Sequence, residues 1–235
     1  MRRDDLDRFY SLMKEASQRQ GGPRTLADSW RASDWPSHGV YFFFEAGEFR
    51  EDGTTPRVTR VGTHAISETS RTTLWDRLRA HKGTVGGSLP SGGNHRSSIF
   101  RLHLGAALLA RDGLWKAAPT TWGKRSSASA DIRRAEHELE LVVSAYVRAM
   151  PFLWIAVPGP GGLGNTRSSL ERNSIALLSN FGRAPIDTPS PAWLGHHSER
   201  ETVRQSGLWN VQHVDKTHDR TYLDSFQLLI SSTRT

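Results

Sequence analysis

The pattern of hydrophobic and polar positions predicts short strands between helices. Residues 39–44 form an aromatic and β-branched run, which is typical of a strand buried on both faces. A turn around Asp52-Gly53 and a second short strand at 57–62 complete a predicted hairpin with a long loop. Before the hairpin, a hydrophobic stripe predicts an amphipathic helix that ends at Gly21-Gly22-Pro23. The stripe consists of Leu6, Phe9, Tyr10, Leu12 and Met13.

The rest of the chain continues this alternation. Helices are predicted over residues 70–82, 131–150, 166–180 and 222–230, and strands over residues 152–157 and 208–214. Gly83 suits the C-terminal cap of the first of these helices. Residues 97–110 are apolar and fit either a strand or a helix. We therefore expect one α+β domain over residues 1–235, with a small mixed or antiparallel sheet flanked by helices.

Composition narrows the class of protein. The chain has 31 Lys and Arg against 24 Asp and Glu, a formal charge of +7 that favours a polyanionic partner. It has no cysteine, which excludes disulfide scaffolds, thiol catalysis and cysteine-ligated zinc. No apolar stretch reaches the roughly 18 residues of a membrane span, and no apolar signal core follows Met1. The sequence thus predicts a cytoplasmic, intracellular protein that does not enter a membrane.

A glycine-rich motif is a weak candidate for cofactor binding. Residues 159–164 match G-x-G-x-x-G between a predicted strand and a predicted helix. A dinucleotide site needs an acidic residue at the end of the next parallel strand. Asp187 has a suitable distance, but Pro185 and Pro189 beside it are incompatible with a central strand. A flexible turn is therefore the favoured interpretation.

Another set of residues suits the cleavage of a phosphodiester. This reaction needs a base for the attacking water, a fixed cation for the developing negative charge, and stabilisation of the leaving oxygen. The candidate residues follow one another in the order Gly39-Val40-Tyr41, Arg60-Val61-Gly62, Arg77, His81 and Glu171. Their order, the hairpin and the two helices resemble the GIY-YIG nuclease superfamily. The spacing Arg-x-x-x-His is similar to its restriction-endonuclease branch.

The resemblance also implies a division of the chain. Residues 39–180 would form a GIY-YIG-like core of a single nuclease domain, and residues of about 83–150 would be an insertion in it. Residues 1–38 and 181–235 would be N- and C-terminal extensions. The similarity is carried by residues 39–81 and, in outline, by residues 152–180.

The resemblance assigns a role to each residue. Tyr41 would be the general base or would orient the attacking water, and Arg77 would hold the scissile phosphate. His81 would polarise Tyr41 or the water from the helix face that also carries Arg77. Glu171 would bind Mg²⁺ (or Mn²⁺) beside the leaving 3′ oxygen, since Mg²⁺ often takes only one or two carboxylates. The asparagine that follows in the family would be Asn180.

Each of these residues also has an ordinary structural interpretation. Tyr41 suits a hydrophobic core, and Arg77 could pair with an acidic neighbour. His81 suits the C-terminus of a helix, where the helix dipole favours a cation. Glu171 suits the first turn of a helix. If only these structural interpretations applied, all four would have to be true at once while the residues happened to follow the family order. The nuclease interpretation is therefore favoured.

The second motif departs from the family, because Arg60 stands where a tyrosine is usual. The change removes a phenol that could orient water or relay a proton. A permanent cation at this position would instead favour the phenolate form of Tyr41. His64 is a second candidate for part of the lost role.

The insertion carries candidate DNA contacts. Asn94, His95 and Arg96 follow a glycine-rich loop and combine hydrogen-bonding groups with a cation, which suits contacts with phosphates or base edges. Lys124 and Arg125 add positive charge, although a solvated surface explains them about as well.

These observations lead to one main functional hypothesis. The chain would be a Mg²⁺-dependent endodeoxyribonuclease, a sequence-specific type II restriction enzyme acting on double-stranded DNA in a prokaryote. By analogy it would be a homodimer, because two-fold symmetry matches a palindromic site. One alternative is a catalytically inactive GIY-YIG-like module that only binds nucleic acid. Another is a repair or antiphage nuclease of loose specificity.

Overall fold

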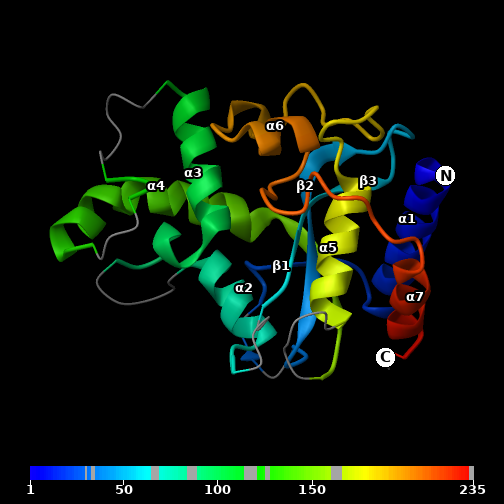
Figure 1. Cartoon of the computed structure of the whole chain (residues 1–235). Helices are drawn as coiled ribbons and strands as arrows, with labels where there is room; N and C mark the ends of the chain where they lie inside the picture. Colours follow the sequence, from blue (N-terminus) through cyan, green and yellow to red (C-terminus); the bar gives the residue numbers. More distant parts are fainter. Residues whose placement is uncertain are drawn as a thin grey trace.

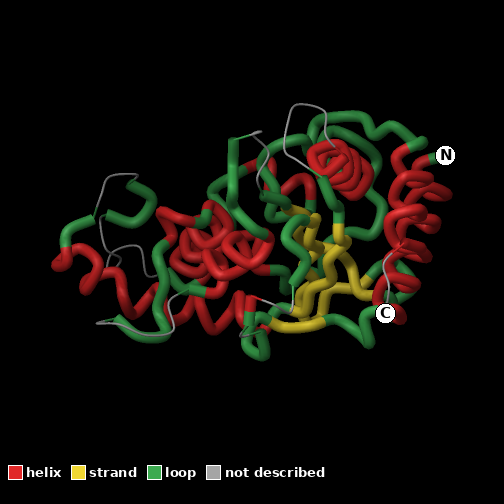
Figure 2. Tube along the Cα trace, turned by 90° about the horizontal axis from the view of Figure 1, so that it is seen from below, coloured by secondary structure: helices red, strands yellow, loops and turns green. Residues whose placement is uncertain are grey.

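The computed structural model places helices on both faces of a small sheet (Figure 1, Figure 2). It describes residues 1–29, 31–32, 35–64, 69–83, 89–113, 121–124, 128–159 and 166–232. The strands are β1 (Arg24–Thr25), β2 (Gly39–Phe49), β3 (Pro56–Gly62) and β4 (Pro151–Ala156). The helices are α1 (Arg2–Arg19), α2 (Leu74–Lys82), α3 (Ile99–Arg111), α4 (Ala130–Ala149), α5 (Thr166–Leu178), α6 (Glu201–Ser206) and α7 (Tyr222–Ser232), with short 3₁₀ turns η2 (His95–Ser97) and η4 (Leu194–His197).

The sheet is antiparallel throughout, with strand order β1-β4-β2-β3. The predicted hairpin is confirmed as β2 and β3, in which Tyr41 lies opposite Gly62 and Phe43 opposite Arg60. The α+β class with flanking helices is confirmed as well. Because β2 lies between β3 and β4 and is covered on both faces, its residues 39–44 read as a continuous hydrophobic run.

Alternate side chains of β2 enter two separate hydrophobic cores. Val40 and Phe42 pack in the core that contains α1, α5 and α7. Tyr41 and Phe43 point into the other core, with α2, α3 and α4. In Figure 1 the first group of helices lies on the right and the second on the left. Both cores also receive side chains from residues 193–230, so the C-terminal segment is packed against the same sheet.

The predicted strand at 208–214 is wrong. The segment after α6 instead covers the outer edge of β3, where the Trp209 amide donates to the Thr59 carbonyl at 2.8 Å. The side-chain amide of Asn210 then completes the edge. It accepts from Val61 N at 3.1 Å and donates to Val61 O at 2.8 Å. Leu208 packs in one hydrophobic core and Trp209 in the other. These buried apolar residues gave the segment its strand-like pattern.

Local hydrogen bonds decide two helix boundaries. The ambiguous residues 97–110 form the helix α3, whose first turn is capped by Ser98. The helix predicted from residue 70 begins at Leu74, because Thr73 and Asp76 form a reciprocal capping box at that point. Gly83 is its C-terminal cap, as predicted. Most of the glycine-rich motif at 159–164 lies outside the described residues.

No helix in the described ranges is both long enough and apolar enough to cross a membrane.

Candidate active site

The hydroxyl of Tyr41 lies at the end of the β2–β3 hairpin. The side chain is buried beside Phe43 and directly opposite Gly62. A Cβ atom at position 62 would overlap with the Tyr41 ring and hydroxyl. The glycine of the second motif is therefore required by close approach, since its missing side chain leaves the space that the phenol fills.

His81 holds the Tyr41 hydroxyl from the other side. Its Nε2 lies 2.8 Å from the Tyr41 oxygen, and its Nδ1 lies 2.7 Å from Oγ of Ser98. Burial, together with the charges of Arg77, Arg60 and Arg101, lowers the pKa of His81 well below its usual value. The imidazole is therefore neutral at neutral pH, with one ring nitrogen as donor and the other as acceptor.

Arg60 brings a buried cation next to Tyr41. It lies on the same face of the sheet, with its guanidinium 4.6 Å from the centre of the Phe100 ring and Nη1 donating to Trp209 O at 2.8 Å. Burial lowers the pKa of Arg60, and attraction to Tyr41 and Glu171 opposes this shift. An arginine begins from so high a pKa that the guanidinium stays charged. The structure therefore places a cation beside Tyr41, at the motif position where the sequence has Arg60 in place of a tyrosine.

Arg77 faces this group from α2, one helical turn before His81. It lies close enough to His81, Arg60 and Glu171 to change the pKa of each of them. No described residue accepts a hydrogen bond from its buried Nε. Arg60 and Arg77 together face one carboxylate, that of Glu171, so the described part of the site carries an excess of positive charge that suits a phosphate.

Glu171 reaches the site from α5, which covers β3 (Figure 1). One carboxylate oxygen, Oε1, accepts from the backbone amide of Thr63 at 3.1 Å, just after the end of β3. Burial raises the pKa of Glu171, and the charges of Arg60 and Arg77 oppose the shift. The carboxylate therefore lies next to both cations but in a weakly solvated position.

A divalent cation would fit at Glu171 as its single protein carboxylate. In the described ranges no three His, Cys, Asp or Glu side chains come together as a metal cluster. Mg²⁺ keeps several water ligands and is often held by one or two carboxylates together with substrate phosphates, so such a cluster is not required. Binding of a cation would also relieve the cost of a charged carboxylate in this position.

A cavity of about 380 Å³ opens beside Arg77. Its lining includes Arg96, Ser98 and the exposed Lys124. The guanidinium of Arg96 donates to both carboxylate oxygens of Glu136, at 2.6 and 2.9 Å. Glu136 thus offsets the charge of Arg96, and the exposed Lys124 adds positive charge to the cavity beside Arg77.

Two other predicted DNA contacts have structural partners. Asn94 caps the turn η2 by accepting from Arg96 N at 3.1 Å. His95 also lines the cavity, but it is 3% exposed and its backbone amide donates to Oε1 of Glu140 at 2.6 Å. These residues hold the loop that carries Arg96. Arg125 lies outside the described residues.

The structure does not bring His64 or Asn180 into contact with Tyr41. Nε2 of His64 donates to the Ser37 carbonyl at 3.2 Å, and burial lowers the pKa of His64 to about 4. Asn180 lies just beyond α5, where its carbonyl oxygen accepts from Arg2 Nη2 and from Ile186 N, each at 2.9 Å. Its amide therefore joins the N-terminal helix to the C-terminal segment.

Sequence reasoning missed Ser98 and Thr63. Ser98 is the partner of His81, and the Thr63 amide positions Glu171. The available signal for Ser98 was its position before the apolar run 99–110, which is typical of a helix cap. A backbone amide such as that of Thr63 leaves no signal in the sequence, because every residue except proline has one.

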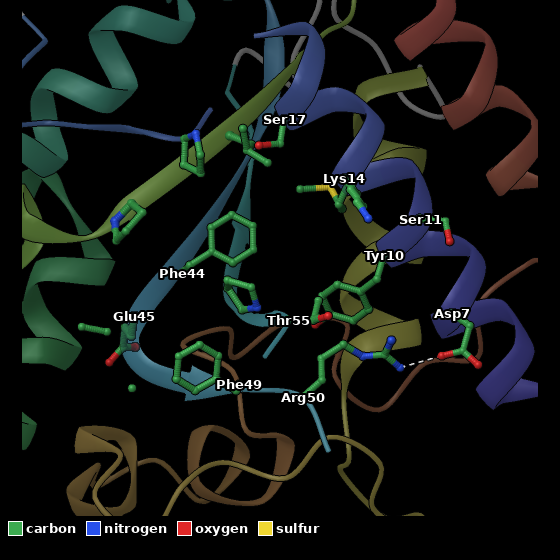
Figure 3. A pocket seen from close by; sticks show the side chains of 17 residues that line it. Asp7, Tyr10, Ser11, Lys14, Ser17, Phe44, Glu45, Phe49, Arg50 and Thr55 are labelled. Carbon is green, nitrogen blue, oxygen red and sulfur yellow. Dashed lines mark hydrogen bonds and ion pairs between the residues drawn. The ribbon is translucent and has the colours of Figure 1, made fainter. Parts of the chain in front are cut away.

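A separate, mainly apolar cavity of about 520 Å³ lies between α1 and the far end of the β2–β3 hairpin (Figure 3). Phe44, Phe49 and Tyr10 are part of its lining, and Arg50 bonds to Asp7 at 2.7 Å along one side. Neither Tyr41 nor any of the charged residues grouped around it lines this cavity.

Comparison with protein families gives one match over the full length. The sequence model described as a GIY-YIG domain matches residues 1–235. Comparison with curated proteins and with solved structures gives no significant match.

Proposed function

The chain belongs to the GIY-YIG nuclease superfamily, and from this premise we propose that it is a sequence-specific endonuclease that hydrolyses double-stranded DNA, with a divalent metal ion, as type II restriction enzymes do. One observation carries the proposal: the Tyr41 hydroxyl, held by neutral His81, lies beside the two cations Arg60 and Arg77 and the carboxylate Glu171. Base, phosphate-binding cations and metal-binding group are thus within one site.

Tyr41 would accept the proton of the attacking water. Its oxygen needs negative charge for this role, and Arg60 and His81 stand beside it to stabilise that charge. Arg77, whose Nε has no described acceptor, would donate to the scissile phosphate and to the charge that grows on it in the transition state. Arg60 would therefore replace the second tyrosine by electrostatic stabilisation of Tyr41 rather than by proton relay.

Glu171 would hold Mg²⁺ or Mn²⁺ beside the leaving 3′ oxygen. The ion would supply positive charge for that oxygen as the bond to phosphorus breaks. Glu171 itself is kept in place by the Thr63 amide, which occupies one carboxylate oxygen. In the described part of the chain Oε2 of Glu171 has no hydrogen-bond or ion-pair partner, which leaves it for the cation.

DNA would extend from the site along the cavity beside Arg77. Arg96 and Lys124 would contact its phosphates there, while Asn94 and His95 would support the loop. A homodimer would place two such sites on the two halves of a palindromic sequence.

Cleavage of a mixed panel of plasmid and phage DNAs tests the proposal. The full chain is incubated with Mg²⁺ or with EDTA, and Glu171→Ala is assayed in parallel. We expect discrete fragments only with the wild-type protein and Mg²⁺. Glu138→Ala, which removes an exposed carboxylate from α4, is the matched control and should cut normally.

Other outcomes point elsewhere. A smear of fragments would favour a repair or antiphage nuclease of loose specificity. Retardation of DNA by both wild-type protein and Glu171→Ala, without cleavage under any condition, would favour a module that only binds nucleic acid. Arg60, which replaces the usual tyrosine, would then be the first position to examine by reversion to Tyr.

A further inference from the structure

Ser98 lies directly behind His81, on the side of the ring away from Tyr41. Its Oγ is 2.7 Å from Nδ1 of His81, while Nε2 of the same ring is 2.8 Å from the Tyr41 oxygen. All three side chains are buried, and Ser98 is only 1% exposed. A continuous chain of hydrogen bonds therefore runs from Ser98 through His81 to Tyr41.

The direction of these hydrogen bonds follows from the number of protons available. A serine hydroxyl has one proton to donate and can accept up to two hydrogen bonds. As the N-terminal cap of α3, Oγ of Ser98 already accepts from Arg101 N at 3.2 Å. If it also accepted from His81 Nδ1, its own proton would be buried, and no other acceptor for it occurs among the described residues. A buried donor without an acceptor is costly. When Ser98 donates instead, the proton without a described acceptor is that of the buried Tyr41 hydroxyl, which is the proton that a general base must give up.

We propose that Ser98 is a positioning residue that donates to Nδ1 of His81 and so holds the ring proton on Nε2, from which His81 donates to the Tyr41 oxygen. The inference rests on the proposed function, because it matters only if Tyr41 acts as the base. No bond breaks in this step: each proton stays on its own donor. In a separate step the Tyr41 O–H bond breaks and its proton passes to water, and His81 and Arg60 then both stabilise the negative charge left on the oxygen.

Arg101 fixes both ends of the Ser98–His81 hydrogen bond. Its backbone amide donates to Ser98, and its Nη1 donates to the backbone carbonyl of His81 at 2.8 Å. The guanidinium is fully buried and paired with Glu140 of α4. Ser98 and His81 are thus held at a set separation by one arginine that belongs to neither α2 nor the sheet.

Nuclear magnetic resonance of the ring nitrogens tests the tautomer directly. In the full chain labelled with ¹⁵N-histidine at neutral pH, the His81 signals should show one-bond coupling to a proton at Nε2 and none at Nδ1. In Ser98→Ala we expect a mixture of the two tautomers. A proton on Nδ1 in the wild-type protein, or an unchanged Nε2 proton in Ser98→Ala, would overturn the proposal.

Cleavage kinetics provide a second test of the role of Ser98. Ser98→Ala should lower kcat by about 10- to 100-fold, the loss typical when the hydrogen-bond partner that orients a metal-bound histidine is removed, with KM unchanged. Ser98→Thr, which keeps the hydroxyl, should recover most of the loss. Ser129→Ala removes the corresponding cap of α4 and controls for the loss of a helix cap. Equal kcat in Ser98→Ala and Ser129→Ala would contradict the role of Ser98.

The two tests separate this inference from the proposed function. If the wild-type protein cuts no DNA, the proposed function fails, and the resonance measurement alone still decides whether Ser98 sets the tautomer. If the wild-type protein cuts DNA and the His81 proton lies on Nδ1, the nuclease stands and the inference about Ser98 fails.

Discussion

The surroundings of Arg77 indicate that an anion binds beside it. A guanidinium has five N–H groups, and a protein normally satisfies those that it buries. The Nε of Arg77 has no acceptor in the described part of the chain, although the residue is next to a second cation, Arg60. An anion bound between Arg77 and Arg60 would accept a hydrogen bond from Arg77 Nε and offset the two positive charges.

Removal of the Arg77 side chain is expected to reduce cleavage strongly. Arg77→Ala should lower kcat by about 10²- to 10³-fold, as loss of one preorganised donor to the transition state does elsewhere. Arg79→Ala, two positions along α2, removes an exposed arginine paired with Asp76 and should leave kcat nearly unchanged. Single-turnover cleavage of a plasmid measures both. Equal loss in the two variants would mean that only the total charge of α2 matters.

Buried neutral histidines predict a dependence of stability on pH. Burial lowers the pKa of His103 in α3 to about 4, below the ordinary 6.5. The unfolded chain therefore binds more protons than the folded one below pH 6.5, and the free energy of unfolding should fall as pH falls, by about 1.4 kcal/mol per pH unit for one such histidine between pH 6.5 and 4. His64 and His81 act in the same direction.

Urea unfolding between pH 7 and 5 measures this dependence. His103→Leu should weaken it, because Leu binds no proton in either state. His197→Leu, at an exposed position in η4, should keep it. Identical pH slopes for wild type and His103→Leu would show that His103 is not kept neutral by the fold.

At the scale of elements, α4 holds α3 and η2 in place behind the site. Glu140 of α4 accepts from Arg101 Nε at 3.1 Å and from the backbone amide of His95 at 2.6 Å. Arg101 in turn bonds to His81 O. A buried ion pair thus connects α3 and α4 to the helix α2, which carries Arg77 and His81.

Breaking this ion pair should lower the free energy of unfolding. Glu140→Ala leaves the Arg101 charge buried without its carboxylate, so we expect a loss of about 3–5 kcal/mol in the free energy of unfolding. Asp131→Ala breaks an exposed ion pair with Arg134 on the same helix and should have little effect. Urea titration compares them. Similar midpoints for the two variants would contradict the importance of the buried pair.

At the scale of the whole molecule, positive charge should govern DNA affinity. The chain carries a formal +7, and Lys124 lies at the cavity beside Arg77, whereas Lys14 lies on α1 at the opposite side of the sheet (Figure 1). Each lysine that neutralises a DNA phosphate releases counterions, so affinity falls with salt in proportion to the number of such contacts.

Lys124→Ala is therefore expected to reduce the slope of log K against log salt concentration by about 1, and Lys14→Ala to leave it unchanged. Binding of a double-stranded oligonucleotide by the full chain, measured with EDTA over a range of salt, gives both slopes. An equal effect of the two substitutions would indicate that DNA follows no particular face of the protein.

The sequence predicted the central part of the fold because that part depends on local patterns. The run at 39–44, the turn and the second strand gave the β2–β3 hairpin, and the helical stripes gave α1, α4, α5 and α7 at nearly their observed positions. The segment at 208–214 was misread because its alternation arises from contacts with two cores, which no local pattern distinguishes from a strand. The two-residue strand β1 is too short to leave a pattern.

The sequence by itself determined the order of the motifs, the candidate residues Tyr41, Arg60, Arg77, His81 and Glu171, and membership of the family. Only the tertiary structure decided that Arg60 rather than His64 stands beside Tyr41, that Asn180 bonds to Arg2, and that Ser98 holds His81. The physical reason is that spacing along one strand or helix is short-range and set by backbone geometry. Contacts between elements depend on how the hydrophobic cores bring distant segments together.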